Sequence, residues 1–314
     1  MTSAPILTIT LNPALDLSAR VSRMEAGPKL RLQDVLREPG GGGVNVARVI
    51  HRLGGAVCAW VALGGATGVQ HRALLQAQGV TLRAFELPVE TRQSWAVTEA
   101  SGAQFRLQLP GDPWPEAEIT RALDDIAQAA PGLVVLSGSQ PPGVPAAFPT
   151  MLAARLGSGR LIIDTSGPAL LQLIAAPAAP VRVLRLDQAE AEAQAGQPLS
   201  AAQDTARFAQ ALRARGVAEM VCIARGADGN ILADASGCLH CCPPQVPERS
   251  KIGAGDSFTG AFALALAQGR PARDALREGT AAAAATVMSV GTALCAPDDV
   301  HALAAQCRVM PLDS

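Results

Sequence analysis

The segment best suited to chemistry is a glycine-rich turn, Gly253-Ala254-Gly255-Asp256, which immediately precedes an apolar helical stretch. Glycines allow unusual backbone angles, so the N–H groups of this turn can point into one concavity at a helix N-terminus, a ready site for a phosphate. Asp256 would lie in the first turn of that helix. There it could cap the helix, or it could accept the proton of a hydroxyl nucleophile. The spacing alone favours neither role.

A second glycine loop, Gly40-Gly41-Gly42-Gly43-Val44-Asn45, also opens a predicted helix. It does not match the dinucleotide-binding fingerprint, because Asn45 occupies the place of the third glycine and the loop does not follow the first core strand. A P-loop is excluded as well, since Lys251 has no Gly-Lys-Ser/Thr context. Bare glycine backbone next to the donor and acceptor of an asparagine amide suits a ligand that carries hydroxyl groups, such as a sugar.

A carboxylate, Asp16, follows the first predicted core strand after a turn at Pro13. Ligands of doubly wound sheets bind beyond the carboxyl ends of the strands, so Asp16 is placed to accept hydrogen bonds from substrate hydroxyls. A simple Asx turn is the alternative interpretation.

These residues must be positioned by alternating β and α segments. Apolar runs predict buried strands over residues 6–11, 57–63, 133–136, 161–163, 181–186 and 220–224. Helical spacing predicts helices over residues 44–53, 69–78, 116–130, 146–156, 202–215, 256–268, 271–290 and 297–306. The alternation predicts an α/β fold with a mostly parallel, doubly wound sheet that has helices on both faces.

Two segments, about 16–38 and 81–109, interrupt this alternation with period-two patterns. Because isolated strand pairs are marginal in water, we expect them to form one small β-sheet, a lid over the main sheet that shares an apolar face with a second subunit. No change of composition marks an independent second domain. The expected organisation is therefore a single domain over residues 1–314.

The composition excludes several classes of protein. A formal net charge of −1 gives no global field that would attract nucleic acid or an anionic membrane. No stretch reaches ~18 uninterrupted apolar residues and the N-terminus lacks a secretory pattern, which predicts a cytoplasmic protein. The seven cysteines fit reduced thiols better than a disulfide framework. Cys238-x-x-Cys241 could begin a metal site, but no second ligand pair at zinc spacing follows it.

Together, the segments Asn12–Asp16, Gly40–Asn45 and Gly253–Asp256 resemble those of the ribokinase-like carbohydrate kinases, specifically the phosphofructokinase-B group. The similarity runs essentially end to end. It is greatest to the minor bacterial ATP-dependent 6-phosphofructokinases, through residues 64–68, 99–102, 137–144 and 164–167. The resemblance implies a ribokinase-like fold whose β-sheet lid often forms a homodimer. It also implies transfer of a phosphoryl group from ATP to fructose 6-phosphate. Fructose-1-phosphate and tagatose-6-phosphate kinases share much of this pattern and stay open as alternatives.

The resemblance assigns a role to each candidate residue. Asp256 matches the general base, and the backbone N–H groups of Gly253, Ala254 and Gly255 match an anion hole for the transferring phosphoryl group. The residues that match contacts to sugar hydroxyls are Asp16, Gly41, Gly42 and Asn45. The residues suited to the phosphate already on the sugar are Lys29, Arg31, Arg92 and Ser139.

The chain departs from the group in the nucleotide half. Where the group has Lys-Pro-Asn-x-x-Glu, residues 185–190 read Arg-Leu-Asp-Gln-Ala-Glu. Asp187 adds negative charge beside the phosphates, which is tolerable if Mg²⁺ is bound there, and Glu190 is available to the water shell of the metal. In the second nucleotide loop, Ala224 replaces a hydroxyl residue, and Arg225 could compensate. The residues assigned to ATP are therefore Asp187, Ala224, Arg225, Gly226, Gly229 and Lys251. A K⁺ site between residues 250–252 and 289–293 is a further implication of the resemblance.

Two readings from other classes remain. A catalytically weak sugar-phosphate sensor would keep Asp16, Asn45 and Arg92, but it has no need of the phosphate cradle at Gly253–Asp256. An NAD-dependent enzyme is disfavoured by the failed fingerprint at Gly40–Asn45.

Overall fold

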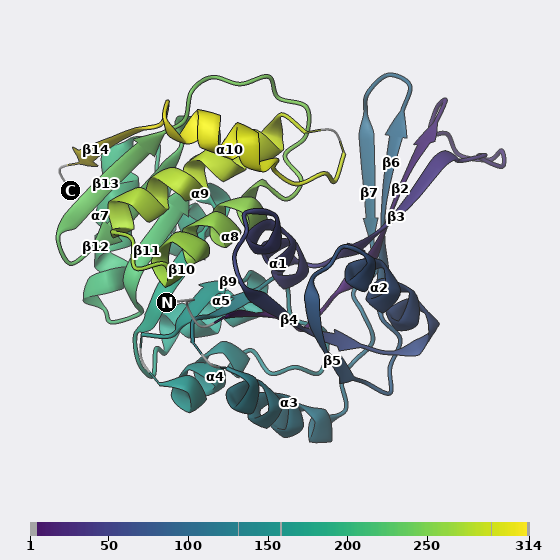
Figure 1. The fold of residues 1–314 in the computed structure, drawn as a ribbon, viewed down its shortest axis with the longest axis horizontal. Coiled ribbons are helices and arrows are strands. Elements are labelled where there is room, and N and C mark those ends of the chain that lie inside the picture. The colour runs from purple at the N-terminus through teal and green to yellow at the C-terminus, as the bar shows by residue number, and fades with distance from the viewer. Residues whose placement is uncertain (1–4, 131, 158, 290, 313–314) are drawn as a thin grey trace.

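The computed structural model describes residues 5–130, 132–157, 159–289 and 291–312, which form two sheets and ten α-helices (Figure 1). The large sheet has the strand order β14-β13-β12-β11-β10-β9-β8-β1-β4-β5. Its strands are β1 (Ile6–Thr10), β4 (Val57–Leu63), β5 (Thr81–Glu86), β8 (Val134–Ser137), β9 (Leu161–Asp164), β10 (Val181–Leu186), β11 (Ala218–Ala224), β12 (Asn230–Asp234), β13 (Gly237–Cys242) and β14 (Arg308–Leu312). From β11 to β5 neighbouring strands are parallel, as the expected fold class requires.

The sequence patterns did not predict the antiparallel edge formed by β12, β13 and β14. This edge also contains the two cysteines of the Cys238-x-x-Cys241 motif and shows how their side chains are placed. Cys238 and Cys241 lie three residues apart on β13, and alternate strand residues face opposite sides of a sheet. The two side chains accordingly belong to different core layers. Among the described residues, no cluster of three His, Cys, Asp or Glu side chains could hold a metal ion.

Helices cover both faces of the large sheet, each packed on its own apolar core. One face carries α1 (Gly42–Arg52), α2 (Gly65–Ala77), α8 (Ala254–Ala267), α9 (Ala272–Val287) and α10 (Pro297–Ala304). The other carries α3 (Glu116–Ala129), α4 (Phe148–Leu156), α5 (Gly167–Ala175), α6 (Gln188–Ala195) and α7 (Ala202–Ala214). The predicted helix over 271–290 ends at Val287, and residue 290 lies outside the described residues. None of the described helices is long and apolar enough to cross a membrane.

The small sheet stands away from the body of the molecule (Figure 1). Its order is β3 (Gln33–Gly40), β2 (Ala14–Val21), β6 (Arg92–Glu99) and β7 (Gln104–Gln108). The expectation that the whole of 81–109 joins this sheet is wrong for its first six residues, which form β5 and pair in parallel with β4. The connection through α2 explains the difference, because a helical crossover returns the chain to the same sheet in parallel orientation.

Candidate active site

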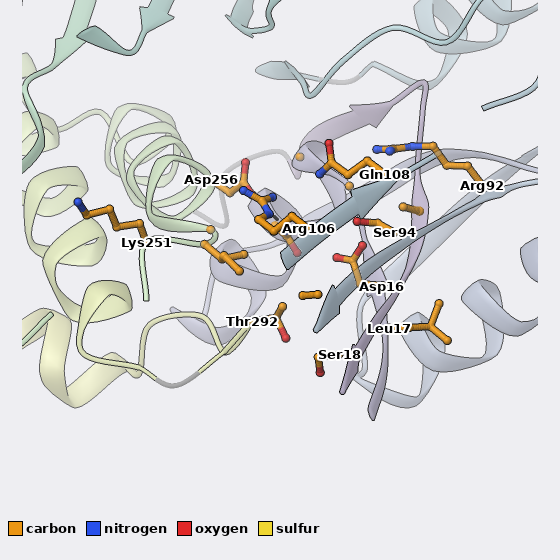
Figure 2. Close-up of a pocket in the computed structure, with 17 residues that line it drawn as sticks. Asp16, Leu17, Ser18, Arg92, Ser94, Arg106, Gln108, Lys251, Asp256 and Thr292 are labelled. Atoms are coloured by element: carbon orange, nitrogen blue, oxygen red, sulfur yellow. Dashed lines mark hydrogen bonds between the residues drawn. The ribbon is translucent and has the colours of Figure 1, made fainter. Parts of the chain in front are cut away.

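A cavity of about 250 Å³ opens between the small sheet and the N-terminus of α8 (Figure 2). Both carboxylates singled out in the sequence, Asp16 and Asp256, line it, although they lie 240 positions apart in the chain. The N-terminus of α1 contributes its N-cap, Gly41, and two residues of its first turn, Gly42 and Asn45. Four of the residues expected to hold sugar hydroxyls therefore meet the expected base in one space.

Asp16 lies on β2, where its carboxylate packs directly against the backbone of β3. A Cβ atom at position 40 would overlap that carboxylate, so Gly40 is required for this approach. Burial raises the pKa of Asp16 to about 6; Arg92 opposes this effect and Glu38 adds to it. An acceptor with a raised pKa and few protein partners is suited to hydroxyl groups supplied by a ligand.

Asp256 occupies the first turn of α8, behind a left-handed N-cap at Gly253 with φ of 76°. The Asn45 side-chain amide donates to its Oδ2 at 2.9 Å. Burial raises the pKa of Asp256 to about 7, and the neighbouring carboxylate of Asp164 adds to the shift. A carboxylate with a pKa near neutral pH is well matched to general base work.

The backbone around Asp256 offers N–H groups to an anion. The first turn of a helix leaves its N–H groups without intrahelical acceptors. The Ala254 N–H donates to the Lys251 carbonyl at 3.3 Å and the Ser257 N–H to the Gly253 carbonyl at 2.8 Å, so the N–H groups of Gly255 and Asp256 stay available to a ligand. Beneath this turn lies Arg185, whose guanidinium would meet a Cβ atom at Gly255. A glycine at position 255 thus brings a cation close to the expected anion hole.

Two residues outside the sequence-based assignment fix this arrangement. Asp164, at the end of β9, accepts from Arg185 Nη1 at 3.2 Å and from Thr259 Oγ1 of α8 at 2.8 Å. It therefore ties α8 to strands β9 and β10. The sequence did contain a signal, because Asp164 follows a buried strand and Arg185 replaces the lysine of the family pattern.

Arg92 and Ser139 come together beside the first cavity. Both line a second cavity of about 550 Å³, and Arg92 lines the first as well. Asn12 connects them, since its carbonyl accepts from Arg92 Nε at 3.3 Å and its Nδ2 donates to Ser139 Oγ at 3.3 Å. The arginine and the hydroxyl are thus near enough to bind one anionic group.

Of the other residues expected to bind phosphate, two line neither cavity and the third lies only at the rim of the first. Lys29 and Arg31 lie exposed on the loop between β2 and β3 and line neither cavity. Lys251 lies at the cavity rim, is exposed, and pairs with Glu248 at 3.3 Å; Figure 2 shows its side chain directed away from Asp256. Any phosphate contact of Lys29 or Arg31 within one chain would require the loop to move.

The small sheet supplies four further polar cavity residues that sequence reasoning missed: Ser18, Ser94, Arg106 and Gln108. Strand register explains their presence. Ser94 is opposite both Asp16 and Gln108, and Ala96 is opposite both Ser18 and Arg106, so these side chains share one face. The period-two pattern predicted the strands, but a sequence does not reveal which strands become neighbours or in what register.

In the nucleotide half, Asp187 and Glu190 cap α6. The Glu190 N–H donates to Asp187 Oδ1 and the Asp187 N–H donates to Glu190 Oε2, both at 2.8 Å. Asp187 therefore suits an N-cap as well as asparagine does. Each carboxylate keeps a second oxygen for a hydrated cation, which fits Mg²⁺ because that ion retains several waters and binds one or two carboxylates plus phosphates. Burial and the carboxylates of Asp187 and Asp164 raise the pKa of Glu190, so a cation would relieve crowded negative charge.

The guanidinium of Arg225 is committed to the fold, which corrects its assignment as a phosphate ligand. It donates to the carbonyls of Leu199 and Ser200, both at 2.8 Å, and to Thr205 Oγ1 at 2.5 Å. The residue is only 7% exposed. The loop of Ala224, Gly226 and Gly229, which includes the short helix η1 (Gly226–Asp228), therefore has mainly backbone to offer a nucleotide.

A family model described as "pfkB family carbohydrate kinase" matches residues 1–299. ATP-dependent 6-phosphofructokinase isozyme 2 of Escherichia coli (strain K12) is 36% identical over 300 residues, covering 94% of this chain and 96% of that protein. A 1-phosphofructokinase of Xanthomonas campestris is 33% identical over 270 residues, covering 84% of this chain and 85% of that protein. Crystal structures of phosphofructokinase-2 from Escherichia coli with potassium and with fructose-6-phosphate match with TM-scores of 0.90 and 0.88, at 34% and 33% identity. In both cases 96% of this chain and 98% of the other are covered.

Proposed function

The chain belongs to the pfkB family of carbohydrate kinases, and on that premise we propose that it phosphorylates fructose 6-phosphate with ATP. Products would be fructose 1,6-bisphosphate and ADP. The observation that carries this proposal is the shared cavity of Asp16 and Asp256 next to the Arg92–Ser139 pair. One acceptor molecule can there present hydroxyls to Asp16, its existing phosphate to Arg92 and Ser139, and its reacting hydroxyl to Asp256.

In this scheme Asp256 accepts the proton of the reacting hydroxyl as the phosphoryl group arrives. Its raised pKa leaves it basic enough for the task, and the Asn45 amide stabilises its ionised form. Phosphoryl transfer needs positioning and electrostatic stabilisation more than covalent help. We assign the stabilisation to the backbone N–H groups of the Gly253–Gly255 turn, with the Arg185 guanidinium beneath them.

The nucleotide would lie toward α6 and the loop 224–229, on the far side of the transfer point from the sugar. Asp187 and Glu190 would hold Mg²⁺ through water, and the metal would neutralise charge on the ATP phosphates. A K⁺ site would lie where Ser250 Oγ donates to the Gly291 carbonyl at 2.7 Å, since that bond joins the two loops assigned to the cation. A related structure contains potassium, which supports this part of the proposal.

A second candidate function is the phosphorylation of fructose 1-phosphate, supported by the relative named 1-phosphofructokinase. Tagatose 6-phosphate is a third acceptor of the same class. ADP release with Mg·ATP, measured across these three phosphosugars and the free hexoses, separates the candidates. We expect the largest kcat/KM for fructose 6-phosphate, and a higher value for fructose 1-phosphate would reassign the substrate. Absence of ADP with every sugar, despite binding of a phosphosugar, would favour the sensor interpretation.

We also propose a homodimer formed through the small sheet. Three large apolar side chains of β7 and the residue that follows it are exposed: Phe105, Leu107 and Leu109. An apolar strand at an exposed edge is a surface that a second chain can cover. Light scattering at twice the monomer mass supports the proposal, and a monomer at micromolar concentration contradicts it.

The cytoplasm is the compartment we propose, because its reducing conditions suit the free thiols of Cys58, Cys222, Cys241, Cys242, Cys295 and Cys307.

A further inference from the structure

An arginine that the catalytic scheme does not use, Arg48, lies buried in α1 one turn beyond Asn45. Its side chain is 3% exposed, yet it carries a full positive charge. The guanidinium donates to Gln78 Oε1 at 2.7 Å, to Glu38 Oε1 at 2.9 Å and to Asn45 Oδ1 at 3.1 Å. A fourth bond, at 3.4 Å, goes to the Pro39 carbonyl, so each nitrogen of the guanidinium bonds to the protein. Arg48 lines neither cavity, which keeps it away from the sugar and the nucleotide.

The bond to Asn45 determines which way that amide faces. An asparagine amide has an oxygen that accepts and a nitrogen that donates, and rotation by half a turn exchanges them. Because Arg48 occupies the oxygen, the nitrogen must point to the other side. There it donates to Asp256 Oδ2 at 2.9 Å. Without Arg48 the amide could turn its oxygen toward the carboxylate, and the contact would become repulsive.

The network reaches the small sheet as well. Glu38 lies on β3, next to Asp16 on β2 in the strand register. Its Oε1 accepts from Arg48, and its Oε2 accepts from the Thr292 hydroxyl, on the loop after α9. One run of bonds therefore connects a strand of the small sheet to the carboxylate on α8.

Stability does not explain this arrangement well. Removing two charges from water is costly, and apolar residues of similar volume often replace a buried ion pair without loss. A buried pair with full hydrogen bonding does, however, hold a polar network in a single geometry. The free energy spent on desolvating Arg48 and Glu38 is accounted for if catalysis needs that single geometry.

We propose that Arg48 is a positioning residue for the base, which fixes the Asn45 amide so that it orients the Asp256 carboxylate and which links that orientation to β3 through Glu38. The inference rests on the proposed function, in which Asp256 is the general base. Asp256 also feels the charges of Asp164, Arg185 and Asp16, and it shares its cavity with Arg106 and Lys251. All five groups are unchanged in Arg48 variants.

The test compares Arg48→Gln and Arg48→Lys with the wild-type protein. We expect Arg48→Gln to lower kcat by about 10–100-fold, because small displacements of a catalytic group have effects of that size. The KM for ATP should stay within about twofold, since no nucleotide contact is removed. The acid limb of the kcat profile should move to higher pH, because the ionised base loses a hydrogen bond. Arg48→Lys, which keeps the charge but not the fork, should recover only part of kcat.

Matched controls separate positioning from folding. Arg83→Gln removes a guanidinium bonded to Asp125, away from both cavities, and should leave kcat and the pH profile unchanged. If Arg48→Gln does not fold, Glu38→Gln makes the same test, with a smaller fall in kcat and the same direction of the pH shift. A folded Arg48→Gln protein with the kcat and acid limb of the wild type overturns the inference. So does a loss of kcat that only follows the fraction unfolded. The proposed function fails separately, if the wild-type protein releases no ADP.

Discussion

The acceptor half and the nucleotide half of the site differ in how their polar side chains are used. In the acceptor half, Asp16 and Asp256 have raised pKa values and few protein partners. In the nucleotide half, Asp187 and Glu190 bond to each other's backbone, and Arg225 bonds to the loop before α7. Side chains of the first half are therefore free to act on a ligand, whereas those of the second mainly hold the backbone to which we assign the nucleotide.

This difference explains where the chain can depart from its family. A side chain whose work is to cap a helix can be exchanged for another good cap, as at Asp187, without loss of the backbone geometry. A side chain that touches the reacting atoms has no equivalent replacement. Substitutions in the acceptor half should consequently alter kinetics, and those in the nucleotide half should mainly alter stability.

The largest effect is expected for Asp256→Ala. Loss of a general base should lower kcat by about 10²–10⁴-fold, while the KM for both substrates changes little. Steady-state ADP release measures it, with circular dichroism as the control for folding. Turnover equal to that of the wild type would show that Asp256 is a helix cap and no more.

Arg92→Ala should act on the acceptor rather than on the chemistry. It removes a charge-assisted contact to the sugar phosphate, so we expect the KM for fructose 6-phosphate to rise by about 10–100-fold. The KM for ATP should not change. Arg92→Lys keeps the charge but loses the paired N–H donors of the guanidinium, so its KM for fructose 6-phosphate should lie between those of the wild type and Arg92→Ala. An equal rise in KM for ATP would place Arg92 outside the acceptor half.

The pH dependence of kcat/KM should show an acid limb near pH 7, where Asp256 gains its proton. Below that limb the rate should fall about tenfold per pH unit, because only the ionised base is active. A profile that stays flat down to pH 5 would contradict the assignment.

The raised pKa of Asp256 also makes stability depend on pH, in the direction opposite to the rate: the rate rises with pH, whereas the free energy of unfolding falls. The folded protein holds this proton more tightly than the unfolded chain, so the contribution of Asp256 to the free energy of unfolding is lost as pH rises through about 7. Asp256→Asn should therefore raise the melting temperature at pH 8 by a few degrees and much less at pH 4. An equal change at both pH values would argue against the buried carboxylate.

Arg225→Ala should destabilise the nucleotide half without a selective effect on ATP. The carbonyls of Leu199 and Ser200 would lose their donor, at a cost of about 1–3 kcal/mol in the free energy of unfolding. Chemical denaturation measures this cost. A large rise in the KM for ATP in the folded variant would restore Arg225 as a phosphate ligand.

The smallest effect is expected for Asp187→Asn, which restores the family residue. Both side chains cap helices well, so the melting temperature should hold and the KM for Mg·ATP should change by less than about threefold. A tenfold change would mean that the charge of Asp187 acts on the nucleotide directly.

The sequence predicted the parallel core and the regions of the acceptor half, because buried strands, glycine loops and isolated carboxylates have strong local signals. It failed where the answer depends on pairing between distant segments. The period-two pattern of residues 81–86 predicts a strand but does not indicate which strand it pairs with, so the expectation that they join the small sheet is wrong. Arg106 and Gln108 became cavity residues through register alone. The role that we propose for Arg48 depends on bonds to two other segments, at Glu38 and Gln78.

A crystal structure with fructose 6-phosphate and a non-hydrolysable ATP analogue tests the central claim most directly. We predict a sugar hydroxyl within about 2.6–3.2 Å of the Asp256 carboxylate. The terminal phosphate of the analogue should lie against the 253–255 turn, next to that hydroxyl. Other hydroxyls of the same sugar should bond to Asp16. A structure in which protein separates the sugar from the terminal phosphate would contradict the account.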